Sequence, residues 1–188
     1  MDVYLVTGKL GSGQTTISHE LANHFNAPYY SVSALLAALA KADSKNSREI
    51  VNCLSCGTLV DDKLTEAVFD TIVSSLTGQS RIVLDGYPKT IDQAKHLIRF
   101  LREKFPVRLV LIQVNLEDRL ILDRALGATE ELEKRLKCSH SHMRDFPTFF
   151  KNLEGAQKCR YITIHNDKAL NVVFSELVQN LTSDDQHS

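Results

Sequence analysis

The sequence predicts an α/β fold in which helices cover a parallel β-sheet. Short apolar runs suited to strands alternate along the chain with segments whose apolar residues recur every three or four positions, which is the pattern of strand–helix–strand units. Residues 107–114 are apolar except for Arg108 and Gln113, as expected of a strand that is buried on both faces. With 188 residues, 43% of them hydrophobic, the chain is long enough to form one domain with a proper core.

In the first half of the chain, an apolar strand from Val3 leads through a glycine-rich turn into a helix. Ile17, Leu21 and Phe25 recur four residues apart in that helix and mark its buried face. Ser33 is the expected N-cap of a later helix, because its hydroxyl can accept a hydrogen bond from the first turn. The other elements expected here are a strand over 27–32, helices over 33–40 and 48–54, the second ended by Gly57, and a longer helix from Asp61 or Asp62 to about 78.

In the second half of the chain, strands and helices continue to alternate. The expected elements are a strand over 81–86, a helix opened by Thr90, the strand over 107–114, helices over 117–125 and about 129–142, a short helix around Phe149 and Phe150 after Pro147, and a strand over 161–164. Val173, Leu177 and Leu181 then repeat at helical spacing and predict the last helix. The polar tail 183–188 is expected to be frayed.

The glycine-rich turn after the first strand carries a clear functional pattern. Residues 8–16 are Gly-Lys-Leu-Gly-Ser-Gly-Gln-Thr-Thr, and a strand, a glycine loop and a helix in this order predict a P-loop. In a P-loop, backbone N–H groups converge on a phosphate at the positive end of the helix. Thr15 stands where a hydroxyl would ligate Mg²⁺, but the lysine expected at position 14 is replaced by Gln14, which carries no charge.

Composition and charge exclude several classes of partner. The formal net charge is −1, so the chain has no global attraction to nucleic acid or to an anionic membrane. No apolar run approaches the roughly 18 residues that a membrane span requires, and no signal peptide precedes the first strand. We therefore expect a cytoplasmic protein with neither nucleic acid nor membrane among its partners.

The four cysteines are too few for a disulfide scaffold in a chain of this length, and we expect reduced thiols. One CxxC pair, Cys53 and Cys56, could in principle form a zinc site with Cys138, His140 and His142. A single CxxC without a second matched pair is weak evidence for a metal, and ordinary helix-end cysteines are the alternative interpretation.

Four segments follow one another in a recognisable order and spacing: residues 8–16, 57–60 (Gly-Thr-Leu-Val), 84–94 (Leu-Asp-Gly-Tyr-Pro-Lys-Thr-Ile-Asp-Gln-Ala) and 130–136 (Glu-Glu-Leu-Glu-Lys-Arg-Leu). They resemble the G-x-P-G-S-G-K-G-T, G-x-L-V, L-D-G-F-P-R-T-x-x-Q-A and E-E-x-x-x-R-L motifs of the adenylate kinase (nucleoside monophosphate kinase) family. The third motif is the specific one. The resemblance implies a P-loop NTPase domain over 1–182 whose five-stranded parallel sheet is covered by helices on both faces. It also implies a small helical monophosphate-binding insertion over about 31–60 and a lid reduced to a remnant over about 124–129.

The same resemblance implies Mg²⁺ with ATP as phosphate donor, and AMP or another nucleoside monophosphate as acceptor. The residues that would hold the ATP phosphates are Gly8, Gly11, Ser12, Gly13, Gln14, Thr15 and Thr16, with Arg124 as an additional candidate. Asp85 would anchor the Mg²⁺ water shell together with Thr15, and Arg135 would face the transferred phosphoryl group. Gln93 would read the monophosphate base, Leu59 and Val60 would line this base, and Gly86 is a further candidate for binding the substrate.

Several of these residues also have a plainer interpretation. Asp85 could be a strand-end acid that caps the next turn, and Gln93 could be an exposed helix residue. Arg135 could be a surface salt-bridge partner on its helix, and Lys9 could be a solvated loop residue.

The chain departs from the family pattern where positive charge is expected. Gln14 replaces the loop lysine, Ala37 stands where the family has an arginine, and Lys89 replaces the arginine of G-F-P-R-T. Because phosphoryl transfer relies on positioning and positive charge, each lost cation typically costs about 10²- to 10³-fold in rate. Lys9 and Lys89 could supply part of the lost charge, and with Arg135 they are the candidate catalytic residues.

Three functions remain open at this level. The first is an adenylate-kinase-like protein that binds nucleotide but transfers phosphate weakly or not at all, and serves as a nucleotide sensor or as the structural partner of another protein. The second is an active nucleoside monophosphate kinase in which Lys9 and Lys89 compensate for the lost cations. The third is an assembly module that binds no nucleotide.

Overall fold

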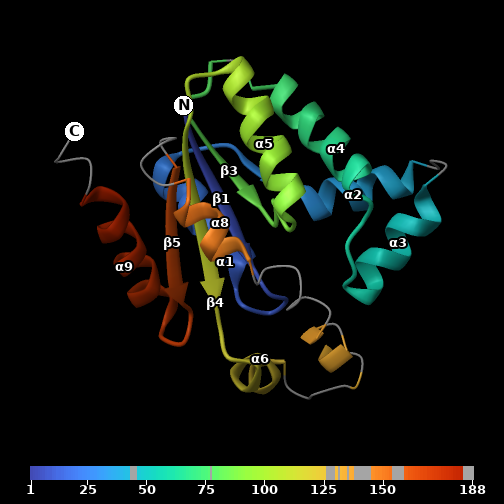
Figure 1. Ribbon diagram of the computed structural model, residues 1–188. Coiled ribbons are helices and arrows are strands. Elements are labelled where there is room, and N and C mark those ends of the chain that lie inside the picture. Colours follow the sequence, from blue (N-terminus) through green and yellow to red (C-terminus); the bar gives the residue numbers. More distant parts are fainter. Residues whose placement is uncertain are drawn as a thin grey trace.

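A computed structural model describes residues 1–42, 46–76, 78–125, 130, 132–134, 136–137, 145–153 and 159–183 (Figure 1). Over these residues the strands form a five-stranded parallel sheet in the order β2-β3-β1-β4-β5. The strands are β1 (Asp2–Gly8), β2 (Tyr29–Ser31), β3 (Arg81–Asp85), β4 (Arg108–Asn115) and β5 (Cys159–His165). The predicted α/β fold with a parallel sheet is confirmed, and β1 lies at its centre.

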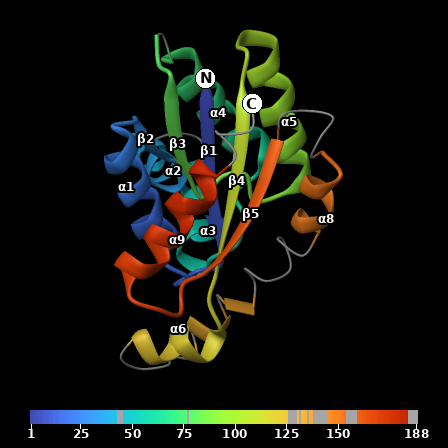
Figure 2. The ribbon, with the colours of Figure 1, turned by 90° about the vertical axis from the view of Figure 1, so that its left-hand side faces the viewer.

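Helices cover both faces of this sheet. They are α1 (Gln14–Phe25), α2 (Val32–Lys41), α3 (Ser47–Cys56), α4 (Asp62–Ser74), α5 (Ile91–Lys104), α6 (Asp118–Arg124), α8 (Phe146–Lys151) and α9 (Leu170–Thr182). Figure 2 shows α1 and α9 on one side of the sheet and α5 and α8 on the other. None of the helices in the described ranges is long and apolar enough to cross a membrane.

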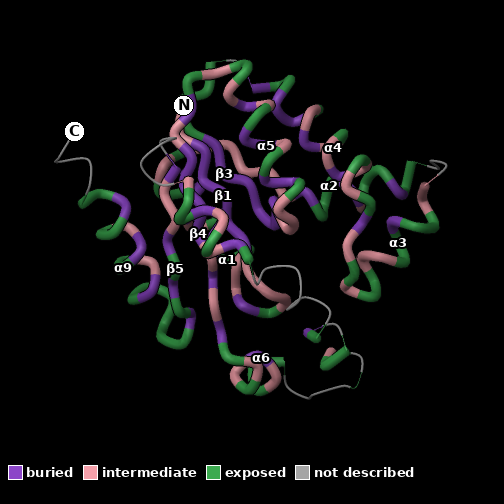
Figure 3. Tube along the Cα trace, in the orientation of Figure 1, coloured by how far each residue is buried: buried purple, intermediate pink, exposed green. Residues whose placement is uncertain are grey.

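The central strand β1 is buried on both faces because its side chains alternate between two cores. Val3 and Leu5 join the larger core, which also takes residues from α2, α4, α5 and α8. Tyr4 and Val6 join a second core with residues of α1 and α9. Figure 3 shows that the three inner strands, β3, β1 and β4, are buried over most of their length. This double burial explains why the strands appear in the sequence as nearly continuous apolar runs.

The segment between β2 and α4 extends away from the sheet. Figure 1 shows α3 on the side of α2 that is far from the strands. The α3 helix ends at Gly57, as predicted, where a φ of 70° suits glycine. These two short helices occupy the region where the sequence predicts a monophosphate-binding insertion.

Three local expectations needed correction or refinement. Ser31, and not Ser33, is the N-cap of α2, because the Ser31 backbone is extended and its hydroxyl accepts from the Ala34 N–H. Asp61 is the N-cap of α4, and this helix ends at Ser74 rather than near 78. The helix expected over about 129–142 and the tail 183–188 lie largely outside the described residues.

Candidate functional site

The glycine-rich turn joins the carboxyl end of β1 to the N-terminus of α1. Gly11 and Gly13 have φ values of 75° and 89°, in the left-handed region. Ser12 donates its backbone N–H to the Lys9 carbonyl at 3.0 Å. The first N–H groups of α1 have no partner within the helix, so this turn presents donors and a positive helix end to an anion. The Ser12 hydroxyl is buried and has no hydrogen-bond partner among the described residues.

A cavity of about 650 Å³ lies between this turn and the insertion, within the range of small-molecule sites. It is lined by residues from the turn, from α1, α2 and α3, and from the loops after α3 and β3. They are Gly8, Lys9, Leu10, Gly11, Gly13, Gln14, Thr15, Ser33, Ala34, Cys53, Leu54, Gly57, Thr58, Leu59 and Lys89. The structure therefore brings many of the sequence-predicted phosphate-binding residues to one cavity, whereas Thr16 is exposed on α1.

Asp85, at the end of β3, is almost fully buried, with 2% of its surface exposed. Its carboxylate accepts hydrogen bonds from Gln14 Nε2 (3.1 Å), Thr15 Oγ1 (2.9 Å), Ser18 Oγ (3.3 Å) and Tyr29 OH (2.8 Å). A carboxylate offers about four acceptor positions, so neutral donors from α1 and β2 suffice to satisfy it. Burial, together with the Asp85 carboxylate, raises the pKa of Tyr29 and keeps this phenol a donor.

Replacing this carboxylate should be expensive for the fold. In Asp85→Asn, the amide group turns N–H donors toward side chains that are themselves donors, so we expect unfolding to become easier by about 3 kcal/mol. Urea unfolding measures the change. Asp92→Asn is the matched control, because the Asp92 side chain is 77% exposed and pairs with Lys95 at the surface. The control should cost less than about 1 kcal/mol, and equal losses in the two variants would contradict the expectation.

Lys89 borders the main cavity from the loop after β3, and its side chain is partly buried. Its Nζ is 4.0 Å from the point at which Gly86 would carry a Cβ, and Gln14 Nε2 is 3.2 Å from the same point. The ammonium of Lys89 and the amide of Gln14 thus both lie close to Gly86. Burial lowers the pKa of Lys89, and the Asp85 charge opposes that shift. Within the described ranges, Lys89 forms no ion pair.

Lys9 is less available to an anion. Its Nζ lies 2.5 Å from Asp118 Oδ1, at the first residue of α6, and its side chain is 19% exposed. Lys9 is therefore neither a freely solvated loop residue nor a cation without a partner.

Gln93 is 2% exposed, so the alternative of an exposed helix residue is wrong. Its Oε1 accepts from the Lys89 backbone N–H at 2.7 Å, and its Nε2 donates to Asp62 Oδ1 at 2.7 Å. Asp62 Oδ2 also accepts from Thr90 Oγ1 at 3.2 Å. Gln93 thereby connects the start of α4 to the backbone that carries Lys89. Beside it lies a small cavity of about 30 Å³, whose lining includes Leu59, Val60, Gly86 and Gln93 and which shares Leu59 and Lys89 with the larger cavity.

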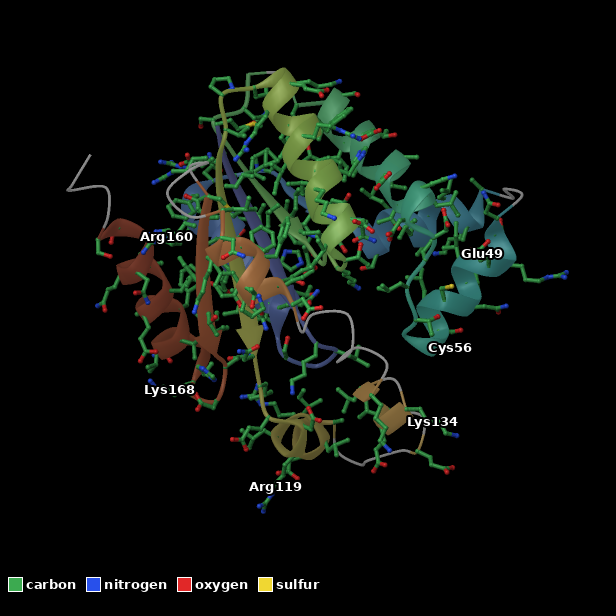
Figure 4. All side chains as sticks on the ribbon, in the orientation of Figure 1. Glu49, Cys56, Arg119, Lys134, Arg160 and Lys168 are labelled. Atoms are coloured by element: carbon green, nitrogen blue, oxygen red, sulfur yellow. The ribbon has the colours of Figure 1, made fainter. Side chains whose placement is uncertain are left out.

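Arg124, at the end of α6, donates from a guanidinium nitrogen to the Asn166 carbonyl at 2.8 Å. Figure 4 shows that Arg119, on the same helix, points away from the rest of the molecule. Arg135 and residues 126–129 of the expected lid remnant lie outside the described residues.

The cysteine pair lies on α3, at the side of the cavity. Cys53 lines the cavity, and Cys56 is exposed at the end of the helix (Figure 4). Cys138, His140 and His142 lie outside the described residues. The described residues include no cluster of histidine, cysteine, aspartate or glutamate side chains that could hold a metal ion.

The sequence interpretation missed several residues of this region, among them Ser18, Tyr29, Asp62 and Asn166. Ser18 had a detectable signal, because it follows Gln14 by one helical turn and so shares its face. Asn166 directly follows the last strand, at the edge of a parallel sheet where ligands bind. Tyr29 and Asp62 had no comparable signal, since only the folding of the chain brings them to Asp85 and Gln93.

Comparison with known proteins identifies the family. A family model described as adenylate kinase matches residues 6–154. An adenylate kinase of Rickettsia bellii (strain RML369-C) is 28% identical over 125 residues, which cover 66% of this chain and 57% of that protein. The chain thus spans little more than half the length of that relative. Adenylate kinases of Wolinella succinogenes and Helicobacter pylori (strain HPAG1) are 26% and 25% identical over 182 and 188 residues. The first alignment covers 93% of this chain and 94% of the relative, and the second 96% and 97%. Because the family model covers most of the sequence, this chain belongs to the adenylate kinase family.

Proposed function

We propose that this protein binds the phosphates of ATP at the glycine-rich turn and transfers phosphate to AMP weakly or not at all. It would then act as a nucleotide sensor or as the structural partner of another protein. The observation that carries the proposal is the hydrogen bond from Gln14 Nε2 to Asp85 Oδ1 at 3.1 Å. It supports the proposal because the side chain at position 14, where the motif calls for a lysine, is a neutral amide that is engaged with Asp85.

Mg²⁺ fits the oxygen-bearing side chains at this site. Thr15 Oγ1 and Asp85 Oδ2 lie 2.9 Å apart, and hydroxyl and carboxylate oxygens are the ligands that this cation prefers. The ion would contribute neutralisation of the phosphate charge. Thr15 and Asp85 are the residues proposed to hold it, with Asp85 acting through water.

The arrangement of cations supports weak transfer. Lys9 is paired with Asp118, and Arg124 is directed at the Asn166 carbonyl. Lys89 borders the cavity without an ion pair in the described part of the chain. The one ammonium without an ion pair among the described cavity residues can bind a phosphate, but the transition state of phosphoryl transfer is stabilised by several cations at once.

An active nucleoside monophosphate kinase is the second candidate. The positions of the Lys89 ammonium and the Gln14 amide, both within 4.0 Å of the point at which Gly86 would carry a Cβ, favour it, because this charge lies in the neighbourhood of position 14. Both proposals include further roles. Lys9 and Arg135 would contribute positive charge, and the insertion over about 31–60 would bind the monophosphate, with its base near Gln93. The segment over about 124–129 would be the remnant of a lid.

The first experiment measures phosphate transfer from Mg·ATP to AMP at high protein concentration, with Asp85→Ala as the background. We expect ATP to bind and turnover to stay close to that background. Turnover far above it would replace the proposal by the active kinase. A folded wild-type chain that binds no nucleotide would replace it by the assembly module.

Lys89 provides a sharper version of the binding test. Lys89→Met should weaken ATP binding about tenfold or more, and Lys89→Arg should preserve binding, because one charge-assisted contact contributes about 1.5–3 kcal/mol. Burial lowers the pKa of Lys89, so its ammonium loses its proton below the ordinary lysine range. Wild-type affinity should therefore fall as the pH rises toward 10.5, whereas Lys89→Arg should show no such fall. Identical pH profiles would exclude Lys89 from phosphate binding.

A further inference from the structure

Asn166, the residue that follows β5, connects three parts of the molecule. Its side-chain Nδ2 donates to the Ser12 carbonyl at 2.8 Å, across a sequence separation of 154 residues. Its backbone N–H donates to the Asn115 carbonyl at 2.8 Å, and its own carbonyl accepts from Arg124. Asn166 is 7% exposed. The residue is thus held at its backbone while its side chain holds the glycine-rich turn.

The contact with Ser12 determines the orientation of one peptide group. In a trans peptide the C=O and the following N–H point in opposite directions. Because the Ser12 carbonyl points at Asn166, the N–H of Gly13 points away from it. Gly13 lines the main cavity, and a Cβ on Gly13 would lie 2.2 Å from Asn166 Nδ2, so the amide lies directly against this peptide.

Arg124 acts on the other side of Asn166. Its guanidinium donates to the backbone carbonyl of Asn166 at 2.8 Å, which holds the loop after β5 against α6. This contact uses an arginine that the sequence suggested as a phosphate ligand.

We infer that Asn166 is a positioning residue, which aims the Gly13 N–H at the phosphate site, and that Arg124 acts through Asn166. The inference rests on the proposed nucleotide site. Loss of the Asn166 amide frees the Ser12–Gly13 peptide to rotate, so one N–H donor to the phosphate is lost. The base and ribose of a nucleotide would not accept a hydrogen bond from the Gly13 N–H.

The test compares two probes, tripolyphosphate and adenosine, by calorimetric titration of the full chain. Asn166→Ala should weaken tripolyphosphate binding about ten- to hundredfold, as expected for one hydrogen bond to a charged group. Adenosine has no phosphate to accept from the Gly13 N–H, so its binding should change less than about twofold, or roughly 0.4 kcal/mol. Asn171→Ala is the matched control, because Asn171 is exposed on α9. Equal losses for both probes, or no loss for tripolyphosphate, would overturn the inference.

A direct readout is the amide resonance of Gly13 in ¹H–¹⁵N spectra. Tripolyphosphate should shift this resonance strongly in the wild type and only weakly in Asn166→Ala. A merely structural role of Asn166 would leave the shift intact at saturating ligand. If Asn166→Ala does not fold, Arg124→Leu gives the same measurement from the exposed end of α6.

A double-mutant cycle assigns the role of Arg124. Arg124→Leu should weaken tripolyphosphate binding severalfold in the wild type and have no further effect in Asn166→Ala. An equal loss in both backgrounds would show that Arg124 touches the phosphate itself and would contradict its action through Asn166. A folded wild-type chain that binds neither ATP nor tripolyphosphate would overturn the nucleotide site, whereas normal binding by Asn166→Ala would overturn only the role of Asn166.

Discussion

Gly13→Ala should destabilise the protein by about 2–5 kcal/mol and abolish the proposed phosphate binding. Two effects add at this position. The Gly13 backbone has a φ of 89°, which costs a residue with a Cβ about 1–2 kcal/mol. The new Cβ would also lie 2.2 Å from Asn166 Nδ2, so the Asn166 side chain would have to move and give up its hydrogen bond to the Ser12 carbonyl. Overpacking of this kind typically costs about 1–3 kcal/mol.

Gly78→Ala separates the two effects. Gly78 has a φ of 73°, but a Cβ on it would meet no atom within 4 Å. This variant should therefore show only the conformational cost, about 1–2 kcal/mol by urea unfolding. Adding Asn166→Gly to Gly13→Ala should recover part of the lost stability, because it removes the clashing amide. If Gly13→Ala and Gly78→Ala cost the same, the close packing of Asn166 on the turn has no energetic weight.

Gln14→Lys should raise the rate of phosphate transfer from Mg·ATP to AMP by about 10²-fold or more, the effect of restoring one cation to such a site. Gln14 borders the cavity, and its amide lies 3.1 Å from Asp85 Oδ1. A lysine there can pair with Asp85 in the free protein and reach a bound phosphate through its longer side chain. ATP affinity should rise as well. A coupled enzyme assay measures the transfer rate, and calorimetric titration measures the affinity.

Gln79→Lys is the control for this gain. It makes the same substitution at an exposed position in the connection before β3, and adds the same charge to the protein. It should leave both binding and turnover unchanged. If Gln14→Lys raises neither ATP affinity nor turnover, as expected for Gln79→Lys, the neutral amide at position 14 does not limit phosphate transfer. Ala37 and Lys89, the other positions that depart from the family pattern, would then be the next to test.

Much of the fold could be predicted because it depends on local patterns. The alternation of apolar runs with helical periods specifies a parallel sheet with helices on both faces, and Gly57 and Thr90 mark helix boundaries where the structure has them. The choice between Ser31 and Ser33 as N-cap was not predictable in this way. Both serines can cap a helix. Ser31 is the N-cap because it is the last residue of β2, so its backbone is still extended where α2 begins.

The candidate site was predictable as a set of positions, but not as a set of contacts. The glycine pattern by itself locates the turn, and the sequence places a neutral glutamine at position 14 of that turn. The partners of Asp85, the burial of Gln93 and the pairing of Lys9 with Asp118 depend on which elements meet.

The sequence by itself determined the parallel α/β sheet, the glycine-rich turn at its centre and the neutral residue at position 14. Periodicity and turn chemistry act over a few residues, so they can be recognised without knowledge of the rest of the chain. Only the tertiary structure decided that Asn166 holds the Ser12 carbonyl and that Arg124 holds Asn166. Those hydrogen bonds join residues 154 and 42 positions apart, and directional bonds between such distant groups form only when the packed sheet and helices bring them together.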